Sequence, residues 1–127
     1  MKRLARDVFN ENLQHLVITP HPVPQVPQDQ FIVARKIKQI TCREMGVTEA
    51  ELDGPSAKEA HWWPRWVGIG LTAHCTRMGM EQIGSTFHRK DVTVCAALRK
   101  ISDELRIYPE RLQDFRRVLT VVEKEVL

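Results

Sequence analysis

The 127-residue sequence lacks the features that mark several common classes of protein. Its three cysteines, Cys42, Cys75 and Cys95, are odd in number and have no paired spacing, so they do not form a disulfide framework and instead indicate small buried residues in a reducing compartment. No apolar run approaches the roughly 20 residues of a membrane span, and residues 1–10 lack the apolar stretch of a signal peptide. We therefore expect a cytoplasmic protein that has no membrane partner.

Motifs for cofactor chemistry are also missing. The sequence has no GxxxxGK[ST] phosphate loop, so nothing predicts ATP hydrolysis. Five residues could suggest a metal site, but no pair of them has the close spacing of a zinc module: His61, His74, Cys75, His88 and Cys95. No cysteine or histidine is placed as a polarised nucleophile. We expect neither a metal nor a cofactor, and we do not expect an enzyme.

The composition is that of one compact, mildly basic domain. Apolar residues make up 43% of the chain, which is enough for a core, and 28% of the residues are charged. The net charge is +3 and the isoelectric point is about 8.9. This charge permits a polyanionic partner without requiring one.

Apolar residues recur with helical spacing along almost the whole chain, which predicts an all-α fold. A first helix is expected over 2–16, followed by four prolines between 20 and 27 that cannot lie inside a helix and favour an extended linker. We therefore divide the chain into an N-terminal helix with a proline-rich linker, 1–28, and a main domain, 29–127. The first helix would pack either on that domain or on a partner.

Further helices follow in the main domain. One is expected over 29–45, and Thr48 with Glu51 forms a capping box for one short helical turn. A longer helix is expected over about 57–77, although Pro64 requires either a start nearer 63 or a kink.

A short helix, a basic turn and a longer helix occupy positions 79–105. Met80, Ile83 and Phe87 mark the short helix, and Asp91 is a candidate N-cap for the longer one. The longer helix has a buried stripe of Val94, Leu98, Ile101 and Leu105. A last helix with an apolar face is expected from Pro109 to the C-terminus, which gives about six helices in all.

This layout is that of a helix-turn-helix. Small side chains at the start of the second helix would let its backbone approach a major groove, and basic residues beside it would neutralise phosphates. Arg89 and Lys90 stand just before the helix, and Thr93 lies in its first turn. Helical pairs with a basic turn also occur in proteins that bind no nucleic acid, so the pattern leaves a DNA groove, a protein partner and the domain's own core as alternatives.

The segment "IGSTFHRKDVTVCAALRKI" resembles the C-terminal DNA-binding domain of the bacterial chromosomal replication initiator DnaA. That family shows Ile-Gly, Phe, a short basic turn, Asp-His-Thr-Thr-Val, and then Arg-Lys-Ile in the same order. Weaker similarity extends over roughly residues 29–105 and includes "WPRW", where the family has Arg-Pro-Arg. The resemblance implies a helix-turn-helix domain that binds double-stranded DNA at a short box, and hence a nucleoid-associated protein in the control of replication or transcription.

The resemblance also implies roles for particular residues. Asp91 and Thr93 match positions of the recognition helix that read bases in the family. Lys90 matches a basic residue of the turn, and Arg65 matches the second arginine of Arg-Pro-Arg; both are expected to face phosphate. Arg89 and Arg99 are further candidates for phosphate contact.

The departures from the family pattern concern the same surface. One residue is missing from Asp-His-Thr-Thr-Val, and Val92 stands near the place of the histidine; valine can touch a thymine methyl group but cannot hydrogen-bond a base edge. The family's basic loop has become "DGPSAKEAH", in which only Lys58 is cationic, so the minor-groove arginine has no match. The initiator's ATPase domain has no counterpart, so we expect a DnaA-like protein that is not the initiator itself.

Three tryptophans lie within five residues at the start of the helix expected over 57–77. Trp62, Trp63 and Trp66 span a broad arc, so one interpretation is core packing and the other is that one or two of them are exposed at a protein interface. The alternative function is therefore a protein-interaction module that regulates the replication-initiation machinery and has lost specific box binding. The sequence does not determine the oligomeric state.

Overall fold

The computed structural model describes residues 4–12 and 29–126, and this part of the chain contains helices and no strand. The all-α class is confirmed. Seven helices are present in the described residues: α1 Ala5–Asn12, α2 Gln30–Met45, α3 Glu49–Asp53, α4 Glu59–Cys75, α5 Met80–Phe87, α6 Asp91–Ile107 and α7 Pro109–Glu125. The seventh is α3, the short turn that the capping box predicts. Thr48 Oγ1 accepts the Glu51 N–H at 3.0 Å, and Glu51 Oε1 accepts the Thr48 N–H at 2.9 Å.

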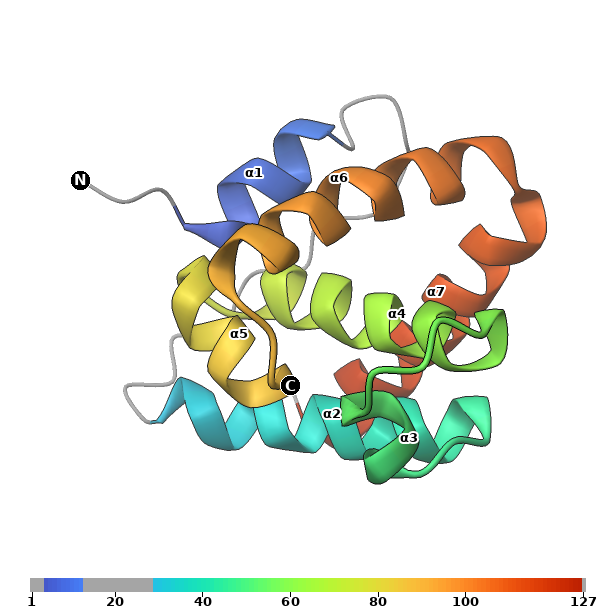
Figure 1. Cartoon of the computed structure of the whole chain (residues 1–127), viewed down its shortest axis with the longest axis horizontal. Coiled ribbons are helices and arrows are strands. Elements are labelled where there is room, and N and C mark those ends of the chain that lie inside the picture. Colours follow the sequence, from blue (N-terminus) through green and yellow to red (C-terminus); the bar gives the residue numbers. More distant parts are fainter. Residues whose placement is uncertain (1–3, 13–28, 127) are drawn as a thin grey trace.

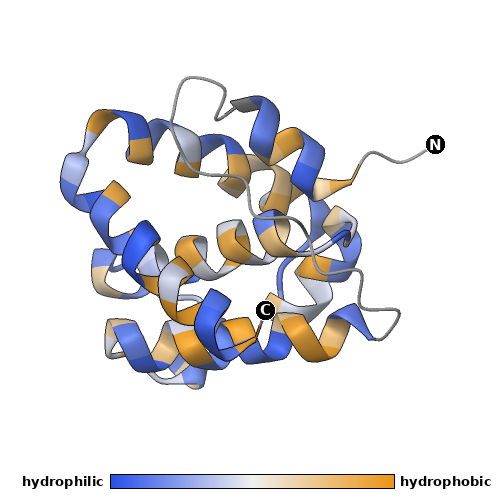
Figure 2. Ribbon diagram, turned by 180° about the vertical axis from the view of Figure 1, so that it is seen from behind, coloured by the Kyte–Doolittle hydropathy of each residue, from blue (hydrophilic) through white to orange (hydrophobic). Residues whose placement is uncertain are grey.

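Helix α4 runs through the middle of the molecule and contacts every other helix (Figure 1). It can do so because it is buried on nearly all sides, including the consecutive residues from Trp63 to Arg65 and from Val67 to Cys75. Gly68 lets helix α5 approach closely, since a Cβ there would lie 2.8 Å from the Phe87 ring. Viewed from behind, apolar residues recur along the inner sides of the helices (Figure 2).

Helix α4 begins at Glu59 and continues through Pro64 without interruption. The sequence left two alternatives, a start nearer 63 or a kink, and the observed start is two residues after the expected 57. Pro64 has no N–H to donate to the carbonyl group of Ala60, so it removes one hydrogen bond of the helix. Its ring is buried, which compensates by removing apolar surface from water.

Helix α1 packs on α4 and α6 and belongs to the same core as the rest of the described chain. Ala5 and Phe9 are fully buried, and the Phe9 ring centroid lies 5.9 Å from that of Phe115. The Ala5 N–H also donates to the Met78 carbonyl at 3.2 Å. Of the two alternatives for the first helix, the structure therefore shows packing on the main domain. The predicted linker, 20–27, lies outside the described residues.

Helix α7 begins with Pro109 in its first turn, as predicted, and packs on α6, α2 and α4. It buries Phe115, Val118, Leu119 and Val122. An ion pair between Arg43 and Glu125 links the ends of α2 and α7. No helix of the described residues has the length and apolar character needed to cross a membrane.

Candidate nucleic-acid interface

A turn of three residues, His88 to Lys90, connects α5 to α6. His88 adopts the left-handed conformation, with φ 56° and ψ 45°, and its N–H donates to the Gly84 carbonyl. The Arg89 N–H reaches the same carbonyl at 2.8 Å. A Cβ on residue 84 would lie 2.2 Å from the Arg89 carbonyl oxygen, so this tight turn requires glycine there. This glycine belongs to the Ile-Gly pair on which the resemblance rests.

The turn exposes the start of α6, although the recognition segment is one residue shorter than in the family. Lys90, Asp91, Val92 and Thr93 are all exposed, and 68% of the Val92 surface is accessible. Val94 is fully buried and begins the stripe that packs into the core. The predicted buried stripe of α6 is confirmed at all four of its positions, Val94, Leu98, Ile101 and Leu105.

The outer face of α6 continues with small and basic side chains. Ala96, Arg99 and Lys100 are exposed one and two turns after the start of the helix. The N-cap is Lys90 and not Asp91 as the sequence predicts. Asp91 is the first helical residue, and its Oδ1 atom accepts the neighbouring Val92 N–H at 2.9 Å. The carboxylate therefore stabilises the free N–H groups of the first turn from within the helix.

Arg65 does not lie where a phosphate contact would place it. Its side chain points inward and is only 7% exposed. The guanidinium group donates to carbonyls of the second half of α3 and of the turn after it: Nε to Leu52 at 2.5 Å, Nη2 to Gly54 at 2.9 Å and to Glu51 at 3.3 Å, and Nη1 to Ser56 at 3.3 Å. Burial, followed by the nearby charge of Arg89, lowers the pKa of Arg65, while Asp53 opposes this shift. This placement disagrees with the expectation that Arg65 faces phosphate.

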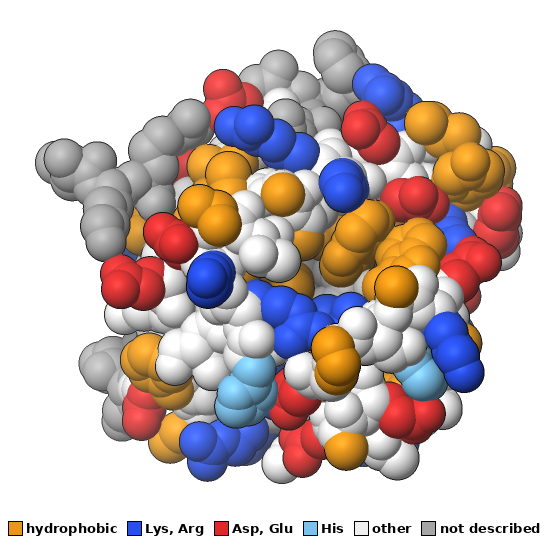
Figure 3. Space-filling view, viewed as in Figure 1, with side chains coloured by type: hydrophobic (Ala, Val, Ile, Leu, Met, Phe, Trp, Pro, Cys, Tyr) orange, Lys and Arg blue, Asp and Glu red, His pale blue; other side chains and the backbone are white. Residues whose placement is uncertain are grey.

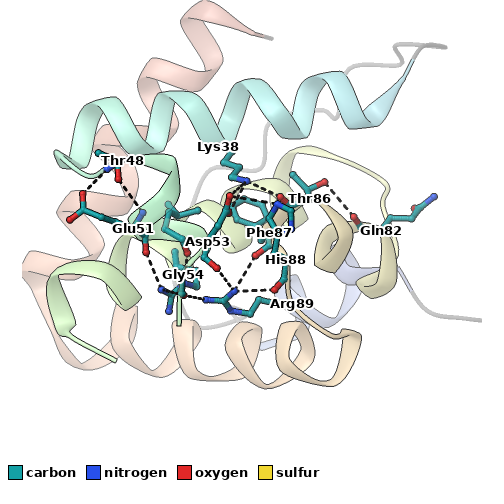
Figure 4. Close-up of polar contacts among 12 residues, drawn as sticks. Lys38, Thr48, Glu51, Asp53, Gly54, Gln82, Thr86, Phe87, His88 and Arg89 are labelled. Carbon is teal, nitrogen blue, oxygen red and sulfur yellow. Dashed lines mark hydrogen bonds and ion pairs between the residues drawn. The ribbon is translucent and has the colours of Figure 1, made fainter. Parts of the chain in front are cut away.

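Arg89 is half-buried and directed toward the same turn (Figure 4). Its Nη1 atom donates to the Asp53 carbonyl at 2.9 Å and to the His88 carbonyl at 3.0 Å, and Nη2 donates to the Gly54 carbonyl at 2.5 Å. Arg89 therefore ties the turn of the helix-turn-helix to the end of α3. Its contacts, like those of Arg65, are with main-chain oxygens inside the protein.

A buried lysine completes this linkage, and sequence reasoning did not identify it. Lys38 lies on α2, which carries several other basic residues, yet it is only 7% exposed. Its Nζ atom lies 2.7 Å from Asp53 Oδ1 and donates to the Thr86 carbonyl at 3.0 Å (Figure 4). The signal was the register: Ala34 and Cys42, four residues on either side of Lys38, are apolar and buried.

The three tryptophans have different environments. Trp63 is buried, and its Nε1 atom donates to Asp114 Oδ2 at 3.2 Å, which agrees with core packing. Trp62 and Trp66 are half-buried, with ring centroids 4.5 Å apart. Both line a shallow groove of about 650 Å³, together with Arg65 and Arg89. Figure 3 shows this face, on which apolar and basic side chains gather around a central hollow.

The cysteines and histidines of the described chain form no arrangement suited to a metal ion. No group of three or more histidine, cysteine, aspartate or glutamate side chains is placed to bind a metal within residues 4–12 and 29–126. All three thiols are free. Burial is the main cause that raises the pKa of Cys42 to about 11 and that of Cys75 to about 12.

The α5–turn–α6 unit, with the start of α6 exposed, makes the chain a helix-turn-helix protein. More particularly, a family model described as the bacterial DnaA protein helix-turn-helix matches residues 34–101, which is more than half of the chain. The chain belongs to this family, and the resemblance stated from the sequence is confirmed. The match begins inside α2 and ends inside α6, so α1 and α7 lie outside it. A search of curated proteins finds no significant match.

Membership of this family indicates binding to double-stranded DNA and a link to replication. The structure retains the part of the family pattern that sets the backbone, namely Gly84, the turn and the buried stripe of α6. It differs in the side chains beside the recognition helix, because two arginines expected at phosphates are directed to carbonyls. The family match and the geometry of the turn therefore agree on the fold, and Arg65 and Arg89 are engaged inside the protein.

Proposed function

We propose that this protein binds double-stranded DNA in a sequence-related manner, with the start of α6 in the major groove, and acts in the control of replication or transcription. The observation that carries the proposal is the exposed end of α6, where four consecutive side chains from Lys90 to Thr93 face outward from a rigid turn. Such a protein would act in the cytoplasm on the nucleoid.

Three neighbouring side chains would read the bases. Asp91 is suited to accept a hydrogen bond from the cytosine amino group, and Thr93 can donate to or accept from a base edge. Val92, 68% exposed, has no hydrogen-bonding group and fits a thymine methyl group. The valine would replace a hydrogen bond of the family by an apolar contact, so we expect a target that differs from the family's box at this position.

Only two of the four basic residues predicted from the sequence to contact phosphates are included in this proposal. Lys90 and Arg99 are exposed on the side of α6 that carries the reading residues. Arg65 and Arg89 are left out of the proposed contacts because their guanidinium groups bind carbonyls of the α3–α4 turn. Each phosphate contact adds about 0.9 to the slope of log affinity against log salt, so we expect a shallow salt dependence.

Fluorescence anisotropy with labelled duplexes tests the proposal. One duplex carries an initiator box and the other a scrambled sequence, and each is titrated at several salt concentrations. Lys90→Ala should weaken binding to both duplexes and reduce the salt slope by about 0.9, whereas Thr93→Ala should change the preference between them. Lys124→Ala is the matched control, because Lys124 is an exposed lysine on α7, away from α6. Equal binding by all four proteins would contradict the assignment of α6.

A second candidate function has its own supporting observation. Trp62 and Trp66 are half-buried in an open groove, and half-buried tryptophans are common at protein interfaces. In this alternative the chain regulates a replication-initiation protein by direct contact and has lost box binding. Absence of duplex binding at low salt, together with a Trp66-dependent complex with a purified initiator, would support it over the first proposal.

A further inference from the structure

The groove beside the recognition helix combines flat aromatic side chains with positive charge. It lies between the α3–α4 turn, the first turns of α4 and the α5–α6 turn, and its volume is about 650 Å³. Trp62 and Trp66 form one side, and Pro55 and Ala57 add apolar surface. Arg65 and Arg89 also line it. These elements come together only in the folded chain.

The two tryptophans present a stacking surface. Their ring centroids are 4.5 Å apart, with an angle of 49° between the ring planes, so the two rings pack against each other at a tilt, and both line the groove. Trp63 does not contribute to this surface, since it is buried and bonded to Asp114. Lys100, an exposed residue of α6, places its Nζ atom over the Trp66 ring, 5.7 Å from the ring centre, so a mobile side chain supplies a cation next to this aromatic pair.

The positive charge in the groove is only partly compensated. Arg65 and Arg89 bind neutral main-chain carbonyls and have no hydrogen bond to a carboxylate among the described residues. Asp53 is the acidic residue of the groove lining, and its carboxylate already pairs with Lys38 at 2.7 Å. The remaining charge attracts an anion, and cations placed close together in a cleft strengthen this attraction.

Stacking surface and positive charge together fit a nucleotide. A base within a duplex is stacked on its neighbours and cannot lie against a half-buried indole ring, whereas an unpaired base can. An acidic peptide would satisfy the charge but would leave the aromatic rings of Trp62 and Trp66 without a matching group. Proteins that bind single strands combine the same two features, aromatic stacking platforms and a basic groove.

We propose that this groove binds an unpaired nucleotide of single-stranded DNA, with the base stacked on Trp62 and Trp66 and the phosphate in contact with Lys100, in the positive field of the inward-directed Arg65 and Arg89. The site is distinct from the start of α6, so one molecule could hold duplex at α6 and an opened strand in the groove. This goes beyond the proposed duplex binding and does not rest on it.

Tryptophan fluorescence tests this directly, because the chain has only three tryptophans. Titration with (dT)12 should quench the emission to saturation, and added salt should weaken the effect. A base stacked on one aromatic ring contributes at least about 1 kcal/mol, so Trp66→Leu should lower the affinity for (dT)12 about five-fold or more. Ile32→Ala, an apolar truncation of an exposed side chain on α2, should leave the affinity for (dT)12 unchanged.

Each other outcome would overturn the proposal. Absence of quenching in the wild-type protein would overturn it without any variant, so the test stays valid if Trp66→Leu does not fold. Lys100→Gln, at an exposed position, is then the second variant and is expected to weaken (dT)12 binding. Equal tryptophan quenching by a hairpin duplex without unpaired bases, or by a poly-glutamate peptide, would reject an unpaired nucleotide in the groove. Loss of (dT)12 binding in Thr93→Ala would also overturn the proposal, because the groove is distinct from the base-reading residues of α6.

Discussion

Replacing Arg65 by alanine should destabilise the fold and leave the phosphate contacts to DNA unchanged. In the family pattern this position is an arginine expected at phosphate, whereas here the side chain is 7% exposed. Its guanidinium group holds four carbonyls of the segment from Glu51 to Ser56. Alanine would remove this donor from the carbonyls of Glu51, Leu52 and Ser56, while Gly54 would keep its hydrogen bond from Arg89, and the α3–α4 turn would lose this attachment to α4.

The size of the effect follows from the geometry. Two of the four hydrogen bonds are short, 2.5 Å to Leu52 and 2.9 Å to Gly54, and two are long at 3.3 Å. A hydrogen bond to a charged group contributes about 1.5–3 kcal/mol, and the cost of burying the guanidinium offsets part of that sum. We expect a loss of about 3–4 kcal/mol in the free energy of unfolding, or roughly 10–15 °C in Tm for a domain of this size.

Urea denaturation and a salt series with duplex DNA together form the assay. Arg65→Ala should lower the denaturation midpoint and, at a temperature where it stays folded, keep the wild-type salt slope. Arg99→Ala is the matched control, an exposed arginine that should keep its stability and reduce the slope by about 0.9. An Arg65→Ala protein with unchanged stability and a reduced slope would refute the reasoning.

Three further predictions concern the turn, the thiols and the capping box. Gly84→Ala should lower the free energy of unfolding by more than about 2 kcal/mol and weaken duplex binding, because its Cβ would lie 2.2 Å from a backbone oxygen. Gly46→Ala, whose Cβ meets no atom within 4 Å, should lower it by about 1 kcal/mol because of its φ of 69° alone, and equal melting temperatures of the two variants would contradict this. A thiol reagent at pH 8 should modify half-buried Cys95 first, since burial raises the pKa of the other two thiols to about 11 and about 12; equal rates for all three in the native protein would disprove it. Hydrogen bonds from Thr48 lower the pKa of Glu51, so the ionised carboxylate stabilises the fold above the pKa of the unfolded chain, and this stabilisation is lost as the pH falls through the pKa of the folded protein. Glu51→Gln should therefore flatten the acid side of a curve of unfolding free energy against pH, and an unchanged curve would count against the capping box.

The position of the helix-turn-helix could be predicted from the sequence because the signals are local. Helical spacing places Val94, Leu98, Ile101 and Leu105 on one face, so the side chains between them must lie on the other faces. Thr93, one position before this stripe, falls on another face of the helix, so the pattern also predicts that Thr93 is exposed. The observed N-cap is Lys90, one residue before the predicted Asp91, since the end of a helix depends on the dihedral angles of the turn.

The directions of the basic side chains could not be predicted in the same way. A guanidinium group needs oxygen acceptors, but its identity does not decide whether these belong to phosphate, water or carbonyls. Arg89 finds its acceptors in Asp53 and Gly54, about 35 positions earlier in the chain. Lys38 likewise pairs with Asp53 only because α2 and α3 pack together.

By itself the sequence determined the helices, the family and the outward face of α6, because each depends on the spacing of residues within a few turns. Only the tertiary structure decided that α1 joins the core through Phe9, and that Arg65 and Arg89 serve the α3–α4 turn. The physical reason is that the carbonyls of this turn need donors once they are enclosed, and packing brings two arginines from elsewhere in the chain within reach. The same packing places Trp66 beside these charges, in a groove that no spacing in the sequence describes.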